Sequence, residues 1–132
     1  MKEYNRRQFI ASASAIAAGP ALGNIIPETE PALVHHVFFW LKNKGSKADA
    51  DKLIEGLQTL RGISEVKKLM IGKPAATEQR GVVDNSYDVS ELMYFNSVAD
   101  QNAYQVHPIH KAFVDKYSHL WEKVIVYDMQ LI

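Results

Sequence analysis

Hydrophobic positions between residues 33 and 131 change between the twofold period of a strand and the longer period of a helix. The first stretch, 33–41, reads LVHHVFFWL and predicts a strand that is covered on both faces. From Ser46 to Leu60 the apolar residues return at helical spacing, which predicts an amphipathic helix. Further apolar runs predict strands at 66–71, 87–95 and 124–131.

A second helical region follows Ser97 and is interrupted at His107–Pro108. The residue before a proline disfavours the helical conformation, whereas a proline is well tolerated in the first turn of a helix. We therefore expect a short helix, a turn at Val106–His107, and a second helix that ends near His119. The resulting order, β-α-β-β-α-β, predicts a ferredoxin-like α+β fold with a four-stranded antiparallel sheet.

The two faces of the predicted sheet differ in what covers them. Alternation along the first strand places His35 on one face with Val37 and Phe39, and His36 on the other face with Phe38. The helices of such a fold cover one face only, so the second face would be both apolar and bare in a monomer. A homodimer joined through this sheet face would cover it and form a dimeric α/β barrel with a cavity.

Residues 1–26 have the layout of an export signal. A basic start that contains Arg6 and Arg7 is followed by a run of small and apolar residues at 9–18. This run is shorter than the ~20 residues that a membrane span needs, and the paired arginines resemble the motif of the bacterial twin-arginine (Tat) pathway. We expect an exported protein, periplasmic or secreted, with no permanent membrane span.

The chain after this signal is interpreted as a short linker at 27–32 and one domain at 33–132. Lys plus Arg number 15 and Asp plus Glu number 15, and this balance argues against a protein that binds nucleic acid. The sequence contains no cysteine, which excludes disulfides, thiol nucleophiles and cysteine-bound metals. Any chemistry must therefore use histidine, tyrosine, serine, carboxylates or amines.

The segment 104–110, Tyr-Gln-Val-His-Pro-Ile-His, contains a Tyr-x-x-His-Pro-x-His motif. This motif and the opening strand at 35–42 resemble the stress-responsive dimeric α/β-barrel (Dabb) family, and the resemblance covers about residues 33–130. It implies a ferredoxin-like fold and a homodimer with a central barrel. Most members of that family have no assigned chemistry and are associated with stress responses.

One plant member of the family, olivetolic acid cyclase, closes a linear polyketide by an intramolecular aldol condensation. The resemblance assigns its general-base histidine to His110, its supporting tyrosine to Tyr104 and a strand histidine to His35. Another histidine of the cyclase pocket is replaced by Val89 in this chain.

His110 and Tyr104 are the candidate catalytic residues. A neutral imidazole can remove a proton α to a carbonyl group, and a tyrosine hydroxyl can stabilise the resulting enolate oxygen. This step needs no cofactor and is compatible with a cyclase, an isomerase or a lyase. The alternative is structural, with the imidazoles bonded to backbone groups at the helix break, and for His107 this alternative is favoured.

The expected ligand is a small apolar or aromatic molecule held in the barrel. The candidate ligand-binding residues are His35, His107, Phe39 and Trp121. We predict no metal and no cofactor, because two histidines in the spacing His-x-x-His are too few for a metal site and no HExxH motif is present. Two further interpretations stay open, a non-catalytic stress-related binding module and a structural homodimer whose barrel is filled.

Overall fold

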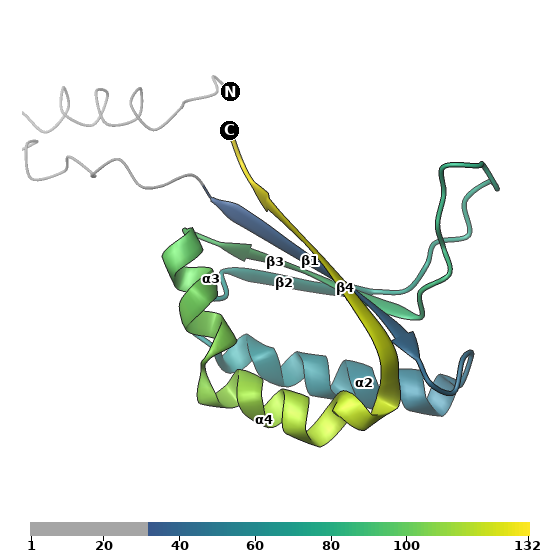
Figure 1. The fold of residues 1–132 in the computed structure, drawn as a ribbon, viewed down its shortest axis with the longest axis horizontal. Helices are drawn as coiled ribbons and strands as arrows, with labels where there is room; N and C mark the ends of the chain where they lie inside the picture. The colour runs from purple at the N-terminus through teal and green to yellow at the C-terminus, as the bar shows by residue number, and fades with distance from the viewer. Residues whose placement is uncertain (1–31) are drawn as a thin grey trace, which may run out of the picture. The chain divides into compact units, whose positions relative to one another are not determined.

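The computed structural model describes residues 32–132 (Figure 1). The predicted export signal at 1–26 and the linker up to residue 31 lie outside the described residues. The elements are β1 (Leu33–Leu41), α2 (Lys47–Thr59), β2 (Lys68–Gly72), β3 (Val89–Phe95), α3 (Val98–Gln105), α4 (Pro108–Tyr117) and β4 (Trp121–Gln130).

The strands form a four-stranded antiparallel sheet in the order β2-β3-β1-β4. With α2 between β1 and β2, and α3 and α4 between β3 and β4, this order confirms the predicted ferredoxin-like fold. The central strand β1 pairs with both β3 and β4, and its register sets His35 opposite Met93 on one side and Asp128 on the other.

Three strands differ from their predicted limits, and for β3 the difference is a start at Val89 rather than at residue 87. β2 begins at Lys68 rather than at residue 66, because the Val66 N–H donates to the Ile63 carbonyl in a turn. β4 begins at Trp121 rather than at residue 124. An irregularity between Trp40 and Leu41 lets the polar start of β4 pair with β1, and a hydrophobic pattern does not detect such a start.

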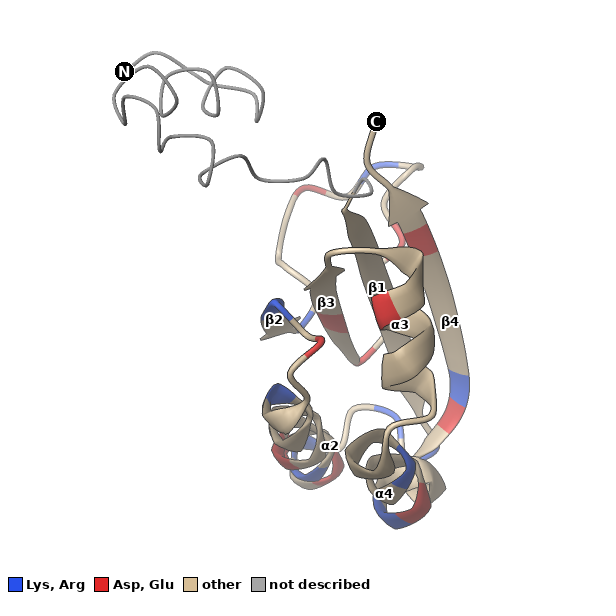
Figure 2. Cartoon of the chain, turned by 90° about the vertical axis from the view of Figure 1, so that its left-hand side faces the viewer, with Lys and Arg blue, Asp and Glu red and all other residues tan. Residues whose placement is uncertain are grey.

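The helices pack on one face of the sheet and form the core with it (Figure 1). Charged residues gather on α2 and α4, whereas the strands are mostly uncharged (Figure 2). The core side chains shared by β1 and α2 include Val37, Phe39, Leu41, Leu53 and Leu57. Burial of this apolar surface is the main contribution to the stability of the fold.

The interrupted helix is present as predicted. α3 ends at Gln105 and α4 begins at Pro108, with His107 at the N-cap position. The N-caps of the other helices are serines, since the Oγ of Ser46 accepts from the Asp49 N–H and the Oγ of Ser97 accepts from the Asp100 N–H, both at 3.1 Å. These caps explain why both helices start where the sequence predicted.

α2 and α4 approach each other closely at Gly56. A Cβ atom at this position would lie 2.6 Å from the Tyr117 ring, so only glycine fits without a shift of the ring. The Tyr117 hydroxyl donates a hydrogen bond of 2.9 Å to Glu55. This contact fixes the position of α4 over the sheet.

The opposite face of the sheet has no helix among residues 32–132 (Figure 1). Several large apolar side chains are exposed on it, with Tyr127 64% exposed, Met129 53% and Met70 43%. We call this surface the open face. Within the same residues, no helix is long and apolar enough to cross a membrane.

Candidate functional site

A pocket of about 180 Å³ lies between the helix-covered face of the sheet and the helices α3 and α4. Its walls are largely apolar and include Phe39, Phe113 and Trp121. The polar side chains that line it come from four elements and are His35, Glu91, Tyr104, Gln105 and His110. A mostly apolar cavity with a few convergent polar groups is typical of a site for a small molecule.

The helix break brings Tyr104 and His110 together. Tyr104 lies near the end of α3 and His110 lies in the first turn of α4, and their ring centroids are 4.6 Å apart. The Tyr104 ring is buried against Phe95, whereas its hydroxyl makes no hydrogen bond with another described residue. A hydroxyl in this state is available to a ligand in the pocket.

The same break fixes the tautomer of His110. In a continuous helix the Gln105 carbonyl would accept from the Ile109 N–H, but that N–H donates to Nδ1 of His107 at 3.0 Å. The Gln105 carbonyl is therefore free to accept from Nδ1 of His110, at 3.1 Å. Because a carbonyl oxygen only accepts, Nδ1 holds the hydrogen and Nε2 is left with its lone pair.

Burial sets the protonation states of this pair. It lowers the pKa of His110, an effect partly opposed by the hydrogen bond to the Gln105 carbonyl and reinforced by nearby His35. Burial, and then the charge of Glu91, raises the pKa of the Tyr104 hydroxyl above its usual range. At neutral pH the site therefore holds a neutral imidazole, which can act as a base, and a protonated phenol, which can donate a hydrogen bond.

A second histidine lines the pocket from β1. Nδ1 of His35 lies 2.5 Å from Oδ1 of Asp128, its cross-strand neighbour on β4. Because the carboxylate accepts, Nδ1 is the donor of this bond, and Nε2 is the ring nitrogen left for a contact with a ligand. The ring is 5% exposed and packs edge-on against Tyr104, with centroids 5.8 Å apart.

Glu91 is a pocket residue that the sequence interpretation missed. It is only 3% exposed, and its Oε1 atom has no hydrogen-bond partner among the described residues. Burial raises the pKa of this carboxyl to about 8, so it is largely protonated at neutral pH. The sequence does indicate that Glu91 faces inward, because side chains alternate along a strand and Glu91 is in phase with the inward residues Val89 and Met93.

The structure brings five of the six predicted site residues to one pocket: His35, Phe39, Tyr104, His110 and Trp121. His107 is not among the lining residues. Its Nδ1 accepts from the Ile109 N–H at the N-cap of α4, which is the structural role that the sequence favours for this residue. The pocket lies on the helix-covered side of the sheet, because Tyr104 and His110 come from helices. A ligand held inside a barrel formed by two open faces stays a prediction.

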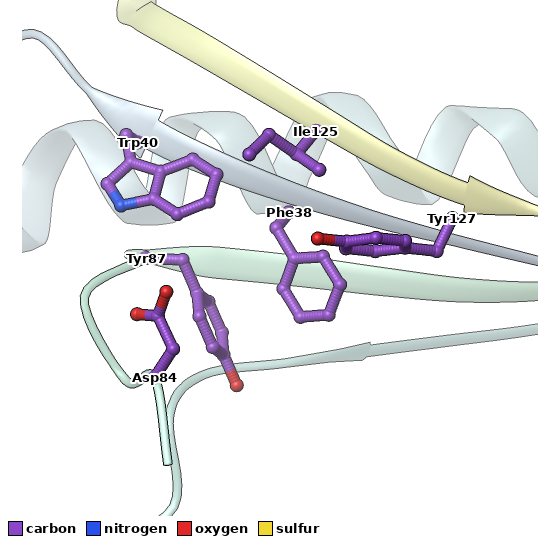
Figure 3. A pocket seen from close by; sticks show the side chains of 6 residues that line it. All are labelled: Phe38, Trp40, Asp84, Tyr87, Ile125 and Tyr127. Carbon is purple, nitrogen blue, oxygen red and sulfur yellow. The ribbon is translucent and has the colours of Figure 1, made fainter. Parts of the chain in front are cut away.

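The open face has a smaller hollow of about 130 Å³ (Figure 3). The rings of Phe38, Trp40, Tyr87 and Tyr127 gather around it, and Asp84 is the charged group at its edge. No histidine lines this hollow. It therefore offers aromatic surface without a base of the kind found on the other side of the sheet.

Among residues 32–132, no group of three or more histidine and acidic side chains could hold a metal ion. The groups gathered in the pocket suit proton transfer and hydrogen bonding to an uncharged ligand.

Comparisons with solved structures show similar folds at low sequence identity. A hydroxynitrile lyase from Passiflora edulis has a TM-score of 0.65 and 23% identity, over 78% of this chain and 95% of that chain. A Dabb family protein from Mesorhizobium loti has a TM-score of 0.64 and 23% identity, over 78% and 99%. A dimeric ferredoxin-like protein from Thermobifida fusca has a TM-score of 0.63 and 19% identity, over 80% and 96%.

No curated protein matches the sequence. The family model of the stress responsive A/B barrel domain (Dabb) matches residues 33–131, a range that contains all four strands and the whole of the 104–110 motif. The chain therefore belongs to the stress responsive A/B barrel domain (Dabb) family.

Proposed function

We propose that this protein binds a small apolar or aromatic molecule in the pocket between the sheet and α3–α4, and acts on it by cofactor-free proton transfer. The proposal rests on one observation, the contact of the His110 and Tyr104 rings at 4.6 Å in the lining of an apolar cavity. Such a transfer is compatible with a cyclase, an isomerase or a lyase reaction.

In the proposed step, Nε2 of His110 removes the proton from the carbon next to a carbonyl group. The C–H electron pair forms a carbon–carbon double bond, and the carbonyl electron pair moves to oxygen. The Tyr104 hydroxyl stabilises that oxygen through a hydrogen bond. The low pKa of His110 and the high pKa of Tyr104 leave both groups in the form that this step needs at neutral pH.

The similarity to a hydroxynitrile lyase supports chemistry of this class, since that enzyme shares the fold. No Lys or Arg is found among the residues that line this pocket. An anion formed there would be stabilised by hydrogen bonds and by the imidazolium that His110 becomes when it accepts a proton.

The test is the exchange of α-hydrogens of acetophenone for deuterium in heavy water, followed by proton NMR. Wild-type protein should accelerate exchange, and His110→Ala should lose about a hundredfold of the rate, as expected for removal of a general base. His119→Ala is the matched control, because His119 is an exposed histidine outside the pocket. Equal rates for both variants would refute a base role for His110.

The alternative is a binding module that holds the same ligand without turnover. The aromatic wall of Phe39, Phe113 and Trp121 supports binding by itself. Saturable ligand shifts in NMR spectra together with no exchange above the buffer rate would favour this alternative.

We also propose that two copies associate through the open face. The support is its exposed apolar surface, which includes Tyr127 and Met129, together with relatives that are described as dimeric. A stable monomer in sedimentation at micromolar concentration would refute this homodimer.

Export through the twin-arginine pathway is a further proposal, supported by Arg6 and Arg7 and the small-apolar run after them. In a bacterium with this pathway, Arg6→Lys combined with Arg7→Lys should retain the protein in the cytoplasm. N-terminal sequencing of the exported protein should begin after Arg7. An exported chain that still contains both arginines would refute cleavage of the signal.

A further inference from the structure

Glu91 is the least explained group in the pocket. Its carboxyl is buried in the middle of a four-stranded sheet, between Val37 on β1 and Ile71 on β2 in the strand register. One of its oxygens has no hydrogen-bond partner among the described residues. A buried polar atom without a partner destabilises a protein, so its presence in a cavity wall suggests that a ligand supplies the partner.

The surroundings of Glu91 determine which partner fits. The titratable groups that face it are His35 from β1, Tyr104 from α3 and His110 from α4, and no Lys or Arg lines the pocket. A carboxyl without a cation nearby is more stable in its neutral form, in which it donates one hydrogen bond. A neutral carboxyl attracts an uncharged oxygen acceptor, and an ionised one would repel an anionic ligand.

We propose that Glu91 binds the carbonyl oxygen of the ligand by donating a hydrogen bond, and thereby selects neutral ketones or aldehydes over carboxylates and amines. This inference rests on the proposed function of the same pocket and names its substrate class. Glu91 and Tyr104 would then approach one oxygen with two donors, while His110 takes the proton from the adjacent carbon.

Atoms and charges balance in this arrangement. His110 accepts the carbon-bound proton, the electron pair moves through the carbon–carbon bond to oxygen, and Glu91 transfers its proton to that oxygen to give the enol. The reverse transfers return one proton to Glu91 and one to carbon, so no oxidant or reductant is consumed. A site in which both the acid and the base are neutral at pH 7 is suited to such a paired transfer.

The experiment compares three one-ring probes of similar size: acetophenone, benzoate and 1-phenylethylamine. Binding to the full chain is measured by NMR shifts at pH 7 and about pH 9. Wild-type protein should bind acetophenone at least about tenfold more tightly than either charged probe. Glu91→Leu should weaken acetophenone binding by about tenfold, the value of one good hydrogen bond. Glu91→Gln keeps a donor and should remain close to wild type.

The pH dependence gives a second readout that does not depend on the folding of Glu91→Leu. Wild-type binding of acetophenone should weaken about tenfold between pH 7 and 9, as the carboxyl loses its proton. Glu91→Gln has no proton to lose there and should bind equally at both pH values. Equal weakening in both proteins would overturn the proposal.

Three further results would also overturn it: no saturable binding of acetophenone, unchanged acetophenone affinity in Glu91→Leu, or tighter binding of the amine or of benzoate than of the ketone. The failures of the two proposals can be told apart with His110→Ala, which should still bind acetophenone. Glu91-dependent binding without deuterium exchange in any variant would refute proton transfer alone. Exchange with binding that ignores Glu91 would refute only the assignment of Glu91.

Discussion

The two faces of the sheet are made by alternating residues of the same strands, yet they differ in chemistry. On the helix-covered face, His35 of β1 meets Asp128 of β4, and Glu91 of β3 points into a cavity. On the open face, the neighbouring positions hold aromatic residues such as Phe38 and Tyr127. One face supplies proton donors and acceptors, and the other supplies exposed apolar surface.

The difference shows that adjacent residues of one strand can contribute to two surfaces with different chemistry. Because side chains alternate with a period of two, a shift of one residue would exchange the two sets completely. Polar groups on the covered face lie in a medium of low dielectric constant, where burial changes their pKa values. Aromatic groups on the open face lie at the surface, where their area is available to another protein.

The largest effect on deuterium exchange is expected when the pocket histidine of β1, rather than its neighbour on the open face, is replaced. His35→Ala should reduce deuterium exchange by about a hundredfold, because it removes a pocket group and leaves Asp128 without its partner. His36→Ala should leave exchange within about twofold, since His36 packs against Phe38 on the open face. Equal losses in the two variants would remove the functional distinction between the faces.

Glu91→Gln should change the pH dependence of stability. The pKa of this carboxyl is raised from 4.5 to about 8 in the folded protein. Between these values the folded state retains a proton that the unfolded state has lost, so stability falls as pH rises. Chemical denaturation at pH 5 and pH 8 should show a fall in wild type that exceeds the fall in Glu91→Gln by at least about 2 kcal/mol. An equal fall in unfolding free energy in both proteins would contradict a buried, protonated Glu91.

Gly56→Ala should destabilise the packing of α2 against α4, the two helices that cover one face of the sheet. The added methyl group would lie 2.6 Å from the Tyr117 ring, and overpacking of this kind costs about 1–3 kcal/mol. Part of that loss is offset by the higher helix propensity of alanine. Thermal unfolding measures the net effect, and Gly81→Ala is the control because nothing lies within 4 Å of a Cβ there. A net gain in stability would show that α2 and α4 separate easily.

Tyr127→Ala tests the role of the open face in the proposed dimer. Its expected effect is the smallest of the four substitutions. Tyr127 is 64% exposed, and its ring lies beside Phe38 with centroids 6.1 Å apart. Loss of one aromatic interface residue should weaken the proposed dimer by about tenfold, measured by sedimentation. Acetophenone exchange per chain should remain unchanged. A lower exchange rate at full dimer dissociation would mean that the two faces are coupled.

The fold could be predicted from local signals. The β-branched and aromatic run of 33–41, the serine caps and the His107–Pro108 break are each decided within a few residues, and each is found where expected. The polar start of β4 was missed, because its pairing depends on an irregularity in β1 rather than on its own composition.

The site could be predicted only in part. The 104–110 motif named Tyr104 and His110, because both lie within one short segment. Asp128 acquires its role from the register between β1 and β4, and no local pattern contains that register. Glu91 was overlooked because a single acidic residue in a strand is normally solvated, and only the phase of the strand shows that it faces inward.

The pairing of His35 with Asp128 also bears on how the protein folds. The two residues are 93 positions apart. β1 therefore cannot pair with β4 until almost the whole domain has been synthesised. Contacts of such long range close late and slow the folding reaction. Trp121 and Asp128 both belong to β4, which leaves the ribosome after every other element of the fold. A chain interrupted before β4 would have the 104–110 motif but would lack the wall of the pocket that β4 supplies through Trp121, Val124 and Val126.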